Sequence, residues 1–114
     1  YRKYLGITPP DDARGCLQDV HWSGGLMGYF PSYTLGNLYA SQLFARAKEE
    51  IGDLEGLFAR GEFGPLRDWL SDRVYVHGMR YRAKELVERI TGKPRSHQAL
   101  IEHLRARFRP LYGV

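Results

Sequence analysis

His21 stands in the part of the sequence best suited to chemistry. Gln18 and Asp19 precede it within three residues, and Tyr29 and Tyr33 follow it across a glycine-rich stretch. The Asp19 carboxylate could orient the imidazole, and an imidazole and a phenol could donate hydrogen bonds to one point, as stabilising an oxyanion requires. The alternative is a core histidine that its Asp neighbour satisfies and that has a structural role only.

The remaining histidines and the single cysteine do not suggest a second site. The HExxH arrangement of a helical zinc peptidase is missing, and His97 and His103 are six residues apart, so they do not share a helix face. Cys16 lacks the spacing of a catalytic thiol, and as the only cysteine it cannot form an internal disulfide. We therefore expect no metal site within this chain.

The segment around His21 carries almost no charge. From Val20 to Ala45 there are 26 consecutive residues without Asp, Glu, Lys or Arg. Pro31 and four glycines make this segment unsuitable as a membrane helix. A surface helix normally keeps a charged face, and a chain of 114 residues has little capacity to enclose such a segment. We expect it to line a cleft or to pack on polypeptide outside this chain.

The hydrophobic spacing predicts an all-α fold of about five helices in a single domain, residues 1–114. Apolar residues recur every fourth position from Leu35 to Ile51, which predicts one long helix over Pro31–Ile51 after the glycine-rich turn, ended by Gly52. Asp53 is a candidate helix cap. The other helices are expected near residues 53–61, 64–78, 84–91 and 96–110, with a short helical end at Tyr1–Leu5 closed by Gly6. In the last helix, Leu104 and Phe108 are expected to point inward and Pro110 to end it.

Composition and charge exclude several classes of protein. Hydrophobic residues make up 43% and charged residues 26%, which is typical of a globular protein. The net charge of +4 arises near the C-terminus, but Arg105, Arg107 and Arg109 are two residues apart and point in different directions around a helix. We therefore expect no nucleic acid partner. No apolar run approaches the roughly 20 residues of a membrane span, and the single cysteine predicts a cytoplasmic location.

Residues 15–22, GCLQDVHW, resemble the GxxQDxHW signature of the carboxypeptidase Taq family, which consists of helical zinc carboxypeptidases. The flanking segments KYLGITPPDDARG, SGGLMGYFPSYTLGNLYASQ and HGMRYRAKELVERITGKP are also similar to the C-terminal part of these enzymes. The family's HExxH and its other N-terminal motifs are absent here. The chain therefore resembles the C-terminal quarter of such an enzyme, within a larger helical, zincin-like cleft fold.

The resemblance implies a zinc-dependent carboxypeptidase whose zinc ligands lie outside this chain. Its partners would be a peptide substrate and the N-terminal remainder of the same polypeptide, and the complete enzyme could form a homodimer. His21 would donate to the oxyanion together with Tyr33, at a spacing of twelve, or Tyr29, at eight. The residues expected to bind substrate are Gln18, Asp19 and Trp22. The competing hypothesis is a free-standing helical module whose Arg-rich C-terminus binds nucleic acid or an acidic partner.

Overall fold

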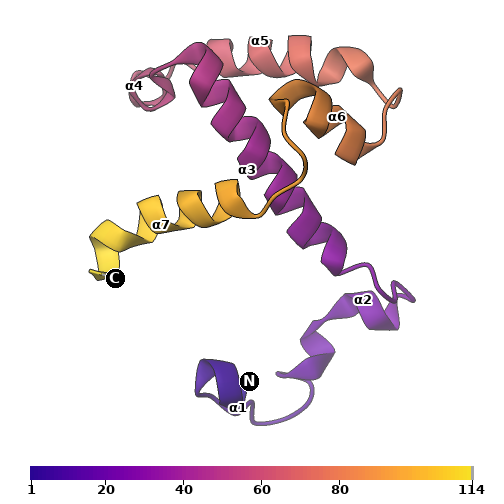
Figure 1. Cartoon of the computed structure of the whole chain (residues 1–114). Helices are drawn as coiled ribbons and strands as arrows, with labels where there is room; N and C mark the ends of the chain where they lie inside the picture. Colours follow the sequence, from indigo (N-terminus) through magenta and orange to yellow (C-terminus); the bar gives the residue numbers. More distant parts are fainter. Residues whose placement is uncertain (114) are drawn as a thin grey trace. The chain divides into compact units, whose positions relative to one another are not determined.

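The computed structural model describes residues 1–113, and every regular element within them is helical (Figure 1). The predicted all-helical class is confirmed. The chain divides into two compact units: unit 1 is Tyr1–Tyr33, and unit 2 begins at Thr34. The elements in order are α1 (Arg2–Leu5), η1 (Cys16–Gln18), α2 (Val20–Ser23), α3 (Pro31–Ile51), α4 (Leu54–Ala59), α5 (Gly64–Arg73), η2 (Tyr75–His77), α6 (Ala83–Thr91) and α7 (Gln98–Tyr112).

The ends of the helices follow the signals in the sequence. The long helix α3 has its predicted bounds and ends at Ile51. Gly52 follows it with a φ of 97°, which glycine adopts readily but which is strained for other residues. The Asp53 carboxylate accepts a hydrogen bond from the Gly56 backbone N–H at 2.9 Å and so caps α4, as predicted. Gly92 adopts a left-handed conformation after α6. These local signals therefore place the helix boundaries of unit 2.

Two parts of the helix prediction differ from the structure. The four-residue helix α2 was not predicted; it forms because the Asp19 side chain accepts the His21 backbone N–H and caps its first turn. The single helix predicted over residues 64–78 is divided, since α5 ends at Arg73 and the 3-10 helix η2 follows. After α5, backbone carbonyls accept hydrogen bonds from residues three positions later, as in a 3-10 helix. One example is the His77 N–H, which donates to the Val74 carbonyl at 3.2 Å.

A small hydrophobic core holds unit 2 together. Ala47 of α3 and Leu54 of α4 are fully buried, and Trp69 of α5 is 8% exposed. In Figure 1, α4 and α5 lie at the C-terminal end of α3. Partly buried side chains surround this centre: Leu43, Phe44, Ile51, Leu57, Phe58, Leu66, Leu70, Val74 and Ile90.

One carboxylate joins α3 to α5 at the edge of this core. Glu50 accepts the Trp69 indole N–H at 2.7 Å and pairs with the Arg46 guanidinium at 2.8 Å and the Arg73 guanidinium at 3.1 Å. The indole hydrogen bond, followed by the two arginines, holds the pKa of Glu50 below its ordinary value. A polar contact thus satisfies the buried indole and ties the two helices together.

The last helix departs from the prediction in two ways. Leu104 and Phe108 were expected to point inward, but they are 38% and 43% exposed. The other helices of unit 2 cover α7 only around its first turns. Pro110 does not end the helix. It removes a single backbone donor from the last turn, and α7 continues to Tyr112 before Gly113, at φ 67°, ends it.

Unit 1 lacks a hydrophobic core. Gly15 is the only buried residue among residues 1–33, and large apolar side chains of this unit are exposed. Several belong to the uncharged segment, and their exposed fractions lie between 46% and 69%: Val20, Trp22, Leu26, Met27, Tyr29, Phe30 and Tyr33. Such a concentration of exposed apolar surface is typical of an interaction surface. No helix of residues 1–113 is long and apolar enough to cross a membrane.

Replacing Leu54 with alanine should strongly destabilise unit 2. The side chain is completely buried in a core of few residues, so the variant should lose about 2 to 5 kcal/mol of unfolding free energy. Urea denaturation followed by circular dichroism measures the change. Val76→Ala is the matched control, because Val76 is 69% exposed and its truncation should cost less than about 0.5 kcal/mol. Equal losses in the two variants would contradict this account of the core.

Acid should weaken the link between α3 and α5. Because folding lowers the pKa of Glu50, its contribution to stability is present above the ordinary value of 4.5 and is lost as the pH falls through the lowered value. Melting temperatures recorded from about pH 7 to about pH 3 should therefore depend less on pH in Glu50→Gln than in the original chain. Glu102→Gln, on exposed α7, serves as the control and should keep the original dependence. If the melting temperature of Glu50→Gln depends on pH as strongly as that of the original chain, ionised Glu50 does not stabilise the contact between α3 and α5.

Candidate functional site

The loop before α2 has a fixed shape that depends on Gly15. A Cβ at this glycine would lie 3.2 Å from both the Asp11 carbonyl oxygen and the Pro9 Cβ, so a larger residue would require these neighbours to move by a few tenths of an ångström. The Gln18 side chain closes the same loop by donating its amide N–H to the Ala13 carbonyl. Gly15 and Gln18 therefore stabilise the loop that positions Asp19 and His21.

Asp19 and His21 form a close pair. Oδ1 of Asp19 accepts the His21 backbone N–H at 2.8 Å and lies 2.7 Å from Nδ1 of the ring. The backbone hydrogen bond, and next the bond to the ring, hold the pKa of the Asp19 carboxyl below its ordinary value of 3.8. Their side chains are 33% and 22% exposed, respectively. The predicted orienting contact between the two residues is present.

The other side of the imidazole faces aromatic residues. Nε2 of His21 lies 3.0 Å from the Tyr33 hydroxyl oxygen. The Tyr29 ring stacks on His21 at a centroid distance of 5.8 Å, and the Phe30 ring meets it edge-on at 5.3 Å. Gly25 and Gly28, with φ of 75° and 76°, allow the turn that separates α2 from these aromatic residues.

The structure thus brings together the three residues predicted as catalytic, His21, Tyr29 and Tyr33. Of the two tyrosines, Tyr33 hydrogen-bonds to the imidazole, whereas Tyr29 contacts the ring face. Phe30 was not predicted as a member of this cluster. Its position in the uncharged aromatic segment was visible in the sequence, but no polar atom distinguished it from its neighbours.

The three predicted substrate-binding residues make different contacts. Gln18 is engaged with the loop backbone, and Asp19 with His21. Trp22 is 65% exposed and lines a separate hollow of unit 1, of about 520 Å³, together with Tyr1, Cys16 and Asp19. Asp19 is therefore the one side chain shared by this hollow and the histidine cluster.

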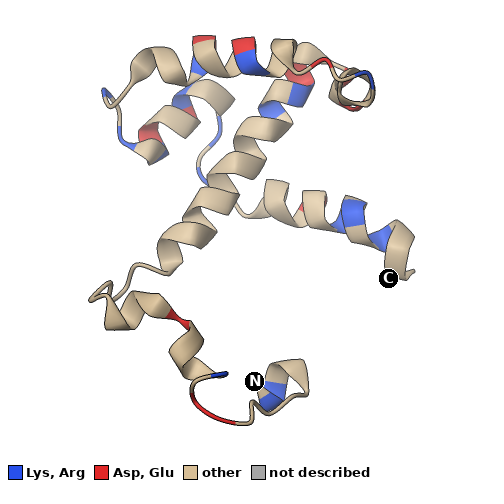
Figure 2. Cartoon of the chain, turned by 180° about the vertical axis from the view of Figure 1, so that it is seen from behind, with Lys and Arg blue, Asp and Glu red and all other residues tan. Residues whose placement is uncertain are grey.

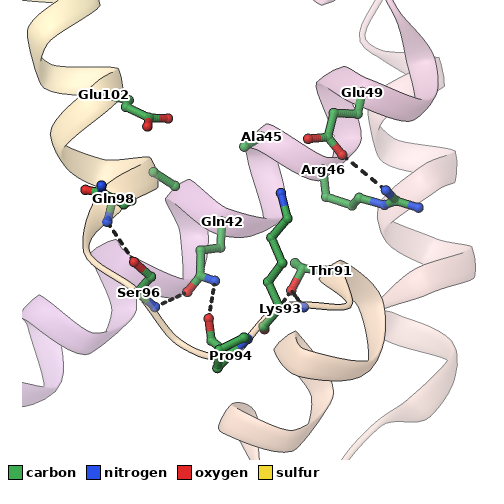
Figure 3. A pocket seen from close by; sticks show the side chains of 11 residues that line it. Gln42, Ala45, Arg46, Glu49, Thr91, Lys93, Pro94, Ser96, Gln98 and Glu102 are labelled. Carbon is green, nitrogen blue, oxygen red and sulfur yellow. Dashed lines mark hydrogen bonds and ion pairs between the residues drawn. The ribbon is translucent and has the colours of Figure 1, made fainter.

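A second hollow, of about 450 Å³, lies in unit 2 between α3, the α6–α7 connection and α7 (Figure 3). Gln42 crosses it, donating to the Pro94 carbonyl at 3.0 Å and accepting the Ser96 backbone N–H at 3.1 Å. Thr91 Oγ1 accepts the Lys93 backbone N–H at 3.3 Å. Sequence reasoning missed this polar cluster, because Gln42 lies 52 residues before Pro94 in the chain. Its hydrogen bonds serve to attach the connection to α3.

Basic and acidic residues occur close together along α5 and α6, whereas the first half of α3 carries neither (Figure 2). Arg89 of α6 bonds to Glu85 at 3.3 Å and lies over the Tyr81 ring at 4.4 Å. Within residues 1–113, the arginines at the end of α7 make no ion pair. The described residues also hold no cluster of three or more His, Cys, Asp or Glu side chains arranged to bind a metal.

Comparison with known proteins gives one consistent answer. The sequence profile of the carboxypeptidase Taq (M32) metallopeptidase family matches residues 1–108. Thermostable carboxypeptidase 1 of Thermus thermophilus is 51% identical over 113 residues, which are 99% of this chain and 22% of that protein. Carboxypeptidase 1 of Bacillus subtilis is 45% identical over 98% of this chain and 22% of its own length.

Solved structures agree with the sequence matches. The M32 carboxypeptidase of Deinococcus radiodurans R1 has a TM-score of 0.91 and 42% identity, covering all of this chain and 23% of that one. Metallocarboxypeptidase 1 of Trypanosoma cruzi has a TM-score of 0.86 and 35% identity over 95% of this chain and 23% of its own. The chain therefore spans somewhat less than a quarter of the length of these relatives. From its residues, its fold and these matches together, the chain belongs to the carboxypeptidase Taq (M32) family of metallopeptidases.

Proposed function

We propose that this chain is a single C-terminal module of a zinc-dependent metallocarboxypeptidase that removes C-terminal amino acids from peptides. It contributes one wall of the substrate cleft. The hydrogen-bonded array Asp19–His21–Tyr33 is the observation that carries the proposal. It places an imidazole and a phenol hydroxyl among exposed apolar side chains of an otherwise uncharged segment. Family membership supports the reaction class, and the coverage of 22% of the relatives supports a module.

In this proposal His21 and Tyr33 stabilise the oxyanion that develops on the scissile carbonyl. The 3.0 Å contact between them favours Tyr33 over Tyr29, since it places a phenol oxygen next to Nε2. Tyr29 and Phe30 support the imidazole through ring contacts. Trp22, which is exposed, is the best placed of the predicted substrate-binding residues to contact the peptide, while Gln18 and Asp19 hold the loop and the imidazole.

The exposed apolar surface of unit 1 supports a covering partner, which we propose is the N-terminal remainder of the same polypeptide. The described residues do not fit a metal, so the zinc ligands of the complete enzyme would lie in that remainder. We further propose a cytoplasmic enzyme, consistent with a single cysteine, and a homodimer as the form of the complete protein.

A chimeric enzyme tests the proposal directly. This chain, substituted for the homologous segment of the Thermus thermophilus carboxypeptidase, should restore hydrolysis of C-terminal residues from a peptide, whereas the 114-residue chain alone should be inactive. The Thermus protein with that segment deleted is the negative control. A chimera that folds and retains its metal but releases no amino acid would reject the proposed function.

Within the chimera, substitutions should separate the two tyrosines. His21→Ala and Tyr33→Phe should each lower kcat by about 10²- to 10³-fold, because each removes a group that acts on developing negative charge. Tyr29→Phe keeps the stacked ring and tests the alternative donor, and Tyr75→Phe, an exposed tyrosine of unit 2, is the control. Melting temperature and metal content are measured in parallel. If His21→Ala lowers only the melting temperature and leaves kcat within about threefold, the histidine is structural.

A further inference from the structure

The ionisation of Asp19 determines where the ring proton of His21 lies. Asp19 Oδ1 receives two hydrogen bonds from His21, and they hold the pKa of this carboxyl below its ordinary value, so it is ionised near neutral pH. An ionised carboxylate is a hydrogen-bond acceptor only. At 2.7 Å from Oδ1, Nδ1 must therefore carry a proton and donate it.

The location of this proton decides the direction of the second hydrogen bond. A neutral imidazole has one N–H, so a proton on Nδ1 leaves Nε2 with a lone pair. The Tyr33 hydroxyl, 3.0 Å from Nε2, is then the donor and the ring nitrogen is the acceptor. In this state both protons of the array point inward, and neither His21 nor Tyr33 can donate to a ligand oxygen.

We infer that Asp19 is a positioning residue that fixes the Nδ1–H tautomer of His21, and that the Tyr33 hydroxyl can donate outward only after Nε2 takes up a proton from solvent. With Nε2 protonated, the ring donates to the Tyr33 oxygen and the phenol proton turns toward a ligand. The array then becomes a donor to an anionic oxygen and gains one positive charge. Its meaning for catalysis rests on the proposed function.

The surroundings of the ring suit this proton-dependent switch. Within unit 1, the titratable or charged groups that face His21 are Asp19 before α2, Tyr29 after the glycine turn and Tyr33 in the first turn of α3. Phe30 adds an apolar edge. The His21 side chain is 22% exposed, which leaves solvent access for a proton while its hydrogen-bond partners stay in place.

Asp19 also caps α2, so the test must separate capping from positioning. Serine caps a helix about as well as aspartate, but its shorter hydroxyl both donates and accepts and cannot enforce one tautomer. Asp19→Ser is therefore the test variant. Asp53→Ser is the matched control, because Asp53 caps α4 in the same way without a histidine partner.

The ¹⁵N spectra of histidine-labelled 114-residue chain report the tautomer. When the ring is neutral, the original chain and Asp53→Ser should show the Nδ1–H form, and Asp19→Ser should lose this preference. His21→Gln assigns the signal. An Nε2–H form in the original chain, or an unchanged tautomer in Asp19→Ser, overturns the inference.

The kinetics of the chimera test the positioning role of Asp19 independently of the spectra. Asp19→Ser should lower kcat by at least about tenfold with little change in KM or melting temperature, whereas Asp53→Ser should leave kcat unchanged. In the original chimera, kcat should fall with rising pH in step with the loss of the Nε2 proton that the His21 ¹⁵N signal reports. A normal kcat in Asp19→Ser, or a pH dependence of kcat unrelated to this signal, contradicts the inference. An inactive chimera rejects the proposed function but leaves the tautomer result standing.

Discussion

The burial of Ala47 and Leu54 against Trp69 is the interaction on which unit 2 depends. These three side chains come from three different helices, and Glu50 satisfies the indole of the third while pairing with arginines on both sides. Because the core is this small, the polar contact at its edge is an additional link between α5 and α3. The remainder of unit 2 is attached to this centre, including the connection to α7 that Gln42 holds.

Unit 1, in contrast, is held together by hydrogen bonds and ring contacts and not by a buried apolar core. It has no apolar interior, and its shape comes from hydrogen bonds along a glycine- and proline-containing loop and from rings packed around one imidazole. Its large apolar residues instead remain on the surface. A segment of this kind gains stability when another surface removes those side chains from water, which supplies roughly 25 cal/mol for each Å² of apolar area buried. The same exposure makes this unit suitable for the role proposed for it as a wall of a cleft.

In the histidine cluster, two hydrogen-bond partners determine the protonation state of one imidazole. A carboxylate on one side of the ring and a phenol on the other leave a single neutral arrangement of protons consistent with both contacts. The protein thus needs no deeply buried charge to define the state of His21. In the role proposed for it, the site would therefore bind an anion according to the protonation of His21 as well as to its geometry.

Much of this protein is determined by its sequence alone. Apolar spacing from Leu35 to Ile51 and the glycine that follows place α3 correctly, and the GxxQDxHW pattern leads to the family. Local patterns carry this information because capping and helix periodicity act over a few residues. Only the tertiary structure decided which tyrosine bonds to His21, why α7 leaves Leu104 and Phe108 exposed, and how Gln42 reaches the α6–α7 connection. These outcomes depend on contacts between residues distant in sequence and on which surfaces find a partner, and neither is encoded in local spacing.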